Sequence, residues 1–153
     1  MAKKMLIAAG IFIVIFIVGG ILALVIGGKN ESAEVKIGSA VFKVEIANTI
    51  IKHSRGLSGR QRLADDEGML FTFSGPGFYS FWMKGMIFPI DIIWISEDRI
   101  IGIESNIPPP ASISDNLTTY APRFAIDKVL EINAGLAERY GFKIGQQIEI
   151  IRN

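Results

Sequence analysis

The chain has 153 residues, half of them hydrophobic, and its 16 basic and 15 acidic residues leave a formal charge of +1. This balance of charge argues against nucleic-acid binding through a broad basic face. The absence of cysteine excludes disulfides, thiolate metal sites and a cysteine nucleophile. With only one histidine, His-based metal sites and a Ser-His-Asp triad are poor candidates, so we expect no metal and no cofactor.

Residues 5–26 form one uninterrupted apolar block. It contains no charge and no proline, and 15 of its 22 residues are Leu, Ile, Val or Phe. As a helix it would be about 33 Å long, against about 30 Å for the hydrocarbon core of a bilayer. A cleaved signal peptide has an apolar stretch of only about 7 to 15 residues and a small-x-small cleavage site. We therefore expect an uncleaved transmembrane anchor, with a cleaved signal peptide or a buried core helix as alternatives.

The charges beside this block predict its orientation. Lys3 and Lys4 precede it without a nearby acid, whereas the charges after it are mixed. The positive-inside rule then places residues 1–4 in the cytoplasm and the domain on the extracytoplasmic side. The expected protein is a single-pass protein of the cytoplasmic membrane that contacts the lipid bilayer through residues 5–26.

Two features connect the anchor to the domain. Gly19, Ala23 and Gly27 recur every four residues, a face of small residues that predicts a weak homodimer through paired helices. Residues 27–40 begin with two glycines and continue with polar side chains, so we expect a flexible linker with a reach of about 20 Å. The folded domain would then occupy residues 41–153.

From residue 41 on, the pattern predicts many short strands and two short helices. Val41–Ala47 alternates polar and apolar residues, as a half-buried strand does. Asn48 or Thr49 can cap a helix that reaches Leu57, and a second short helix at 134–140 would end at Gly141. Further strands are expected at 69–73, 79–84, 91–95, 100–104, 126–132 and 147–151, with a tight turn at 75–77 and an aperiodic stretch at 105–124. The sum is an α+β, mainly β fold with a small barrel-like sheet, preceded by one transmembrane helix.

Two sequence blocks within the domain resemble a known family. Gly68-Met69-Leu70-Phe71 and Phe81-Trp82-Met83-Lys84 occur in this order, preceded by Arg55-Gly56-Leu57 and followed by Val129-Leu130-Glu131. Together they are similar to the domain of unknown function family 192, also called uncharacterised protein family 0127, over residues 41–151. The resemblance implies a bacterial or archaeal source and, as in many members, an N-terminal export signal or anchor. It implies no particular activity.

Polar residues embedded in apolar strands are the candidates for a ligand site. A buried carboxylate must be paired, hydrogen-bonded or neutralised, and the same residues could instead be structural ion pairs. Basic side chains could hold an anionic group, and a tryptophan offers a flat apolar surface with one donor. The expected ligand-binding residues are Arg55, Arg60, Trp82, Lys84, Asp91 and Glu131.

Three functional hypotheses follow from these residues. The leading one is a non-catalytic binding or accessory module for a small anionic ligand, an envelope polymer or a partner protein, with residues 105–124 as a lid. The alternative is a cell-envelope hydrolase that uses Asp91 and Glu131 as an acid/base pair, which requires carboxyl groups about 5 to 9 Å apart. In the third hypothesis the polar residues are purely architectural.

Overall fold

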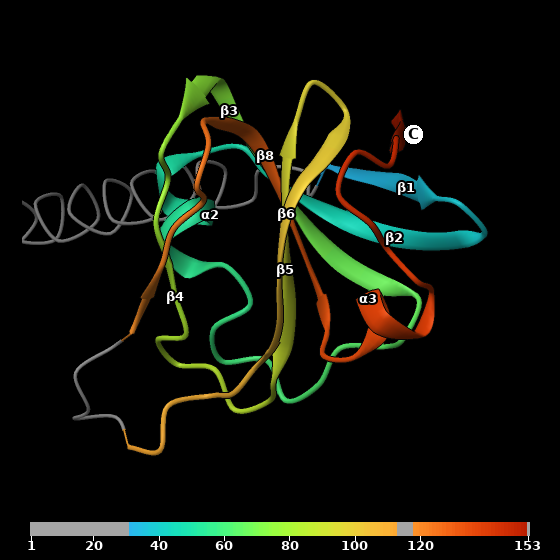
Figure 1. Ribbon diagram of the computed structural model, residues 1–153. Helices are drawn as coiled ribbons and strands as arrows, with labels where there is room; N and C mark the ends of the chain where they lie inside the picture. The colour runs from blue at the N-terminus through green and yellow to red at the C-terminus, as the bar shows by residue number, and fades with distance from the viewer. Residues whose placement is uncertain (1–30, 113–117, 153) are drawn as a thin grey trace, which may run out of the picture. The chain divides into compact units, whose positions relative to one another are not determined.

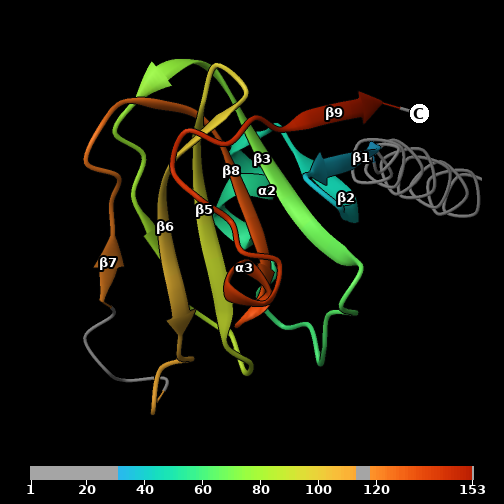
Figure 2. The same ribbon diagram turned by 45° about the vertical axis from the view of Figure 1, so that its right-hand side comes forward.

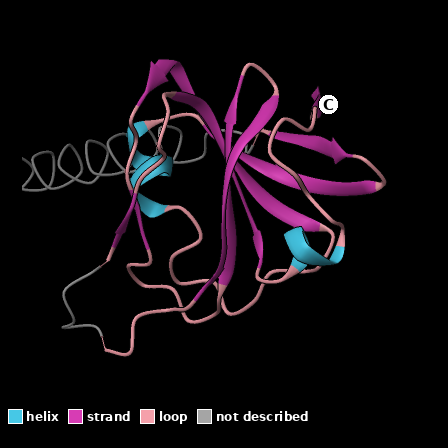
Figure 3. Ribbon diagram, in the orientation of Figure 1, coloured by secondary structure: helices cyan, strands magenta, loops and turns pink. Residues whose placement is uncertain are grey.

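The computed structural model describes residues 31–112 and 118–152. The expected anchor at 5–26 and its small-residue face lie outside this range. Within the described part of the chain, no helix combines the length and the apolar character needed to cross a bilayer. The described residues form a mainly β fold with two short helices, as Figures 1 and 3 show.

The main element is a seven-stranded sheet with the order β6-β5-β8-β3-β2-β1-β9. Neighbouring strands are antiparallel except β2 and β3, which run parallel and are joined through α2. β4 and β7 pair separately as a two-stranded sheet. The elements are β1 (Ser32–Ile37), β2 (Ala40–Ala47), α2 (Ile50–Arg55), β3 (Glu67–Gly77), β4 (Phe81–Trp82), β5 (Ile90–Ser96), β6 (Arg99–Ile107), β7 (Thr119–Tyr120), β8 (Ile126–Asn133), α3 (Leu136–Arg139) and β9 (Glu149–Arg152).

The two faces of the sheet carry separate apolar clusters. On one face, Leu130 and Ile132 of β8 pack with Leu136 of α3. On the other face, Phe71 of β3 packs with Leu57, which follows α2. In Figure 2, α3 lies in front of the sheet and α2 behind it. β5 contributes to both clusters and all its residues from 90 to 95 are buried, which confirms the expected central strand.

The sheet is not closed into a barrel. Within residues 31–112 and 118–152, backbone hydrogen bonds join its two edges only where the segment before β9 meets the start of β6. There the Ile100 N–H donates to the Gln146 carbonyl at 2.9 Å, and the Ile148 N–H donates to the Asp98 carbonyl at 2.9 Å. The expected barrel-like sheet is therefore an open sheet with one point of contact between its edges.

Three further expectations need correction. The linker prediction is wrong from residue 32, because β1 pairs with both β2 and β9 and its apolar side chains are buried. The turn expected at 75–77 is instead the end of β3, where the pairing with β8 shifts register between Thr72 and Gly77. The strand expected at 79–84 is only two residues long, because only Phe81 and Trp82 have a partner strand, β7.

Candidate functional site

A pocket of about 340 Å³ opens between α2 and one face of the sheet. Its walls come from α2 and the loop after it, from β3, from residues 79–82, and from β5 and β8. This volume is in the range typical of small-molecule sites. The aromatic residues that line it are Phe71, Phe73, Tyr79, Phe81 and Trp82.

α2 stands over the sheet without burying any residue of its own. The helix begins where the Thr49 side chain accepts a hydrogen bond from the Lys52 N–H at 3.2 Å, as predicted, and it ends at Gly56. His53 holds it to the sheet, because its Nε2 lies 2.9 Å from the Ala47 carbonyl oxygen and 3.2 Å from that of Thr72. The His53 ring also lies against Phe73, with ring centroids 4.7 Å apart. Because α2 buries none of its own residues against the sheet, the apolar surface below it is covered only in part and forms a pocket.

The aromatic wall is held together by contacts between its own rings. Phe73 and Tyr79 stack with ring centroids 3.6 Å apart, and the Tyr79 hydroxyl donates to the Gly75 carbonyl at 2.8 Å. Phe81 meets Phe71 edge-on at a centroid distance of 4.9 Å. Trp82 is half exposed. The wall is therefore preformed, with one ring reaching the solvent.

Glu131 is the buried polar group of this pocket. Its neighbours across the sheet are Met69 and Ile92, and it is 5% exposed. Its carboxyl group has no hydrogen-bond or ion-pair partner among residues 31–112 and 118–152. Burial alone raises the pKa of Glu131 from 4.5 to about 8, so the carboxyl is mostly protonated at neutral pH.

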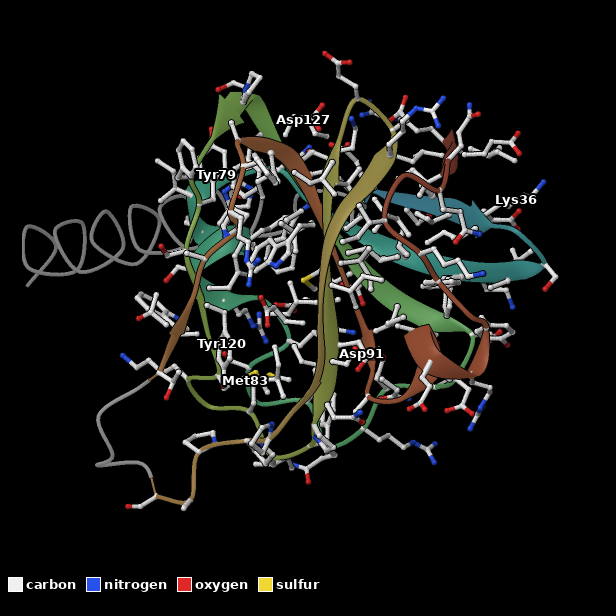
Figure 4. The ribbon with its side chains drawn as sticks, in the orientation of Figure 1. Lys36, Tyr79, Met83, Asp91, Tyr120 and Asp127 are labelled. Carbon is white, nitrogen blue, oxygen red and sulfur yellow. The ribbon has the colours of Figure 1, made fainter. Side chains whose placement is uncertain are left out.

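Asp91 lies on the opposite face of the sheet. Ile92, its neighbour in β5, pairs directly with Glu131, and successive side chains of a strand point to opposite faces. Asp91 therefore faces α3, and Figure 4 shows it beside that helix while Tyr79 lies on the α2 side. Its carboxylate accepts hydrogen bonds from the backbone N–H groups of Gly135 and Ala137 at α3 and of Asn106 in β6. The structure does not bring the expected acid/base pair of Asp91 and Glu131 together. Among the described residues, no group of three or more His, Cys, Asp or Glu side chains could hold a metal ion.

Of the six expected ligand-binding residues, the pocket brings together Arg55, Trp82 and Glu131. Arg60 lies in a separate, smaller groove, where its Nη1 is 2.7 Å from Oε1 of Glu45. The hydrogen bond from Arg60 lowers the pKa of Glu45. Lys84 is exposed and is not part of the pocket lining.

Of the aromatic wall, the sequence identified only Trp82 as a candidate for the pocket lining. Alternation along the strand expected at 79–84 predicts that Tyr79, Phe81 and Met83 share one face, directed to the core. Tyr79 and Phe81 do pack against the core, but they are only half buried and also line the pocket. Met83, assigned to the core with them, is buried as expected. The signal that could have identified the wall is the density of aromatic residues between 71 and 82, which is more than one short strand needs for packing.

Comparisons with known proteins agree with this fold. Residues 33–150 match the family model DUF192, described as "Uncharacterized ACR". No curated protein matches the chain. A protein of unknown function from Novosphingobium aromaticivorans DSM 12444 is 36% identical, with a TM-score of 0.68 over 77% of this chain and 83% of that one. A protein from Sinorhizobium meliloti 1021, named as a proposed transcription regulator, is 31% identical, with a TM-score of 0.67 over 78% of this chain and 92% of that one.

The family match begins within β1 and ends within β9, so it covers almost all of the described fold. It starts at residue 33, which places β1 inside the domain rather than in a linker. Because the family model matches residues 33–150, well over half of the chain, the chain belongs to the DUF192 family.

Proposed function

We propose that this domain is a binding module for a small ligand that occupies the pocket beside α2. The observation that carries the proposal is the unpartnered, buried carboxyl group of Glu131 in a lining that is mainly apolar. Burying a polar group without a hydrogen bond is costly, and such a group is worth retaining where a ligand satisfies it. The aromatic rings around it would supply apolar contact area for the rest of the ligand.

A non-catalytic role is favoured over hydrolysis. Glu131 is the only acid among the described residues that line the pocket. The lining serines, which are Ser54, Ser58 and Ser80, make no hydrogen bond with His53 in the described part of the chain. Neither a carboxylate pair nor a nucleophile with an adjacent base is therefore formed there.

We propose further that residues 5–26 tether this module to the cytoplasmic membrane with the domain outside. The support is the length of the apolar block and the two lysines before it. A phosphatase reporter fused after Asn153 should be active only when the domain is exported, and the chain should stay in the membrane pellet after carbonate extraction. A fusion active only in the cytosol, or a chain that carbonate releases, would contradict the tether.

Blocking the pocket should weaken ligand binding. The probes are 2-phenylethanol, 3-phenylpropionate and 2-phenylethylammonium, which share a phenyl ring and differ in charge, offered to the full chain in lipid nanodiscs. We expect at least one to bind, and the Ser80→Trp variant, which places an indole in the lining, to weaken its binding by about tenfold or more. Saturation-transfer NMR and calorimetry measure the binding.

The matched control is Ser74→Trp, which adds the same ring at an exposed position outside the pocket lining. This variant should bind like the wild type. The proposed site would be wrong if none of the three probes bound to the wild type, or if the Ser80→Trp variant bound them as tightly as the wild type does.

A further inference from the structure

The pocket surrounds an acid with aromatic rings but gives it no positive partner. Arg55 lines the pocket, yet it is exposed and lies beyond ion-pair distance of Glu131. His53, the other basic residue of the lining, turns its Nε2 toward the carbonyl oxygens of Ala47 and Thr72. The positive charge that normally accompanies a buried carboxylate is therefore missing from the described part of the chain.

We propose that the ligand supplies this charge: an organic ammonium group pairs with the Glu131 carboxylate, and the apolar part of the same ligand packs against the aromatic wall. This inference rests on the proposed function and specifies its ligand class. The faces and edges of Phe71, Tyr79 and Phe81 surround the space that the ligand would enter. Aromatic faces attract a desolvated cation, and the effect adds to the ion pair in a site from which water is excluded.

The geometry disfavours the anionic ligand expected from the sequence. That expectation relied on a joint action of Arg55, Arg60 and Lys84, but only Arg55 reaches the pocket. The ionised form of Glu131 would repel an anion in these apolar surroundings. A neutral ligand that donates a hydrogen bond to Glu131 is the remaining alternative, and the experiment below separates it from the cation.

Pairing with a cation requires the ionised form of Glu131, which links binding to pH. The charged or titratable groups that face the pocket with it are His53 and Arg55 on α2 and Tyr79 on the wall. Because burial raises the pKa of Glu131 to about 8 in the empty pocket, cation binding at pH 7 releases a proton. The affinity for the cation should then rise by about tenfold from pH 6 to pH 7 and by about fivefold from pH 7 to pH 8.

Calorimetry on the full chain in nanodiscs tests the inference with the three phenyl probes at pH 6, 7 and 8. We expect 2-phenylethylammonium to bind about tenfold or more tightly than 2-phenylethanol at pH 8, with proton release at pH 7. The Glu131→Gln variant should lose both the preference for the cation and the proton release. The matched control is Glu45→Gln, which removes an acid outside the pocket and should keep both.

The possible failures are distinguishable. If the alcohol or the carboxylate binds in the pocket as tightly as the amine, or if the Glu131→Gln variant keeps the preference for the cation, the site stands and the ammonium assignment is wrong. If none of the probes binds to the wild type, the proposed function fails together with the inference.

Discussion

Substituting Asp91 by Asn is expected to lower the free energy of unfolding by about 3 kcal/mol. The Asp91 side chain is fully buried, and its oxygens accept hydrogen bonds from the backbone N–H groups of Asn106 at 2.8 Å, Gly135 at 3.1 Å and Ala137 at 2.9 Å. An asparagine offers only one acceptor oxygen, and its NH₂ group would face N–H donors that cannot accept. Chemical denaturation of the two proteins measures the difference.

The loss of stability in Asp91→Asn should be largest in the backbone segments that donate hydrogen bonds to the carboxylate. Asn106 at the end of β6 and Gly135 before α3 both have left-handed backbone conformations, with φ of 55° and 82°. The hydrogen bonds to Asp91 hold Asn106 and Gly135 against β5. The Asn variant should therefore show faster hydrogen exchange at the backbone N–H groups of Gly135 and Ala137. The control is Asp66→Asn, an exposed carboxylate paired with Lys43 at 3.3 Å, which should change stability by no more than about 0.5 kcal/mol.

The same variant tests whether Asp91 belongs to a ligand site. Asp91 and the pocket lie on opposite faces of the sheet, so probe binding should survive in Asp91→Asn under conditions in which that variant remains folded. Wild-type stability of the variant would contradict the anchoring role. A selective loss of probe binding would restore the site role that the sequence had indicated.

Local patterns in the sequence predicted most of the strands. The alternation at Val41–Ala47 and the apolar run after Asp91 correspond to β2 and β5, and Thr49 caps α2 as expected. β1 was missed although Ala33, Val35 and Ile37 alternate with polar residues, because the glycines and polar residues before it dominated the interpretation. The sequence does not show where a linker ends and a strand begins when both segments contain charged residues.

The candidate site was predictable only in part, because it depends on how distant strands align. Each of Asp91 and Glu131 was recognisable as an acid in an apolar strand, but the sequence does not show which faces they share. The pairing of Ile92 with Glu131 decides this, since a shift of one residue in register would have placed both acids on one face. Likewise, the sequence does not show that Arg60 pairs with Glu45, and without that ion pair Arg60 remained a candidate for ligand binding.

Replacing Glu131 by Gln is expected to remove a pH dependence from the stability of the domain. The folded-state pKa of Glu131, about 8, lies above its ordinary value of 4.5, and the cause is burial. Between these values the folded chain holds a proton that the unfolded chain has lost, so the stabilising effect is complete below pH 4.5 and is lost as the pH rises toward 8. From pH 5 to pH 8 the wild type should lose about 3 kcal/mol through this group alone.

The measurement is the free energy of unfolding at several pH values for the wild type and Glu131→Gln, taken as a difference so that other titrating groups cancel. The free energy of unfolding of Glu131→Gln should rise steadily relative to that of the wild type from pH 5 to pH 8, because the neutral amide of the variant does not ionise in the apolar pocket. The difference between the wild type and Glu45→Gln should stay almost constant from pH 5 to pH 8, because Arg60 lowers the pKa of Glu45 below its ordinary value of 4.5 and this carboxyl is then ionised in both the folded and the unfolded chain. A difference between wild type and Glu131→Gln that does not change with pH would mean that Glu131 is solvated or paired, and the pocket would then lack the unpartnered acid on which ligand recognition depends.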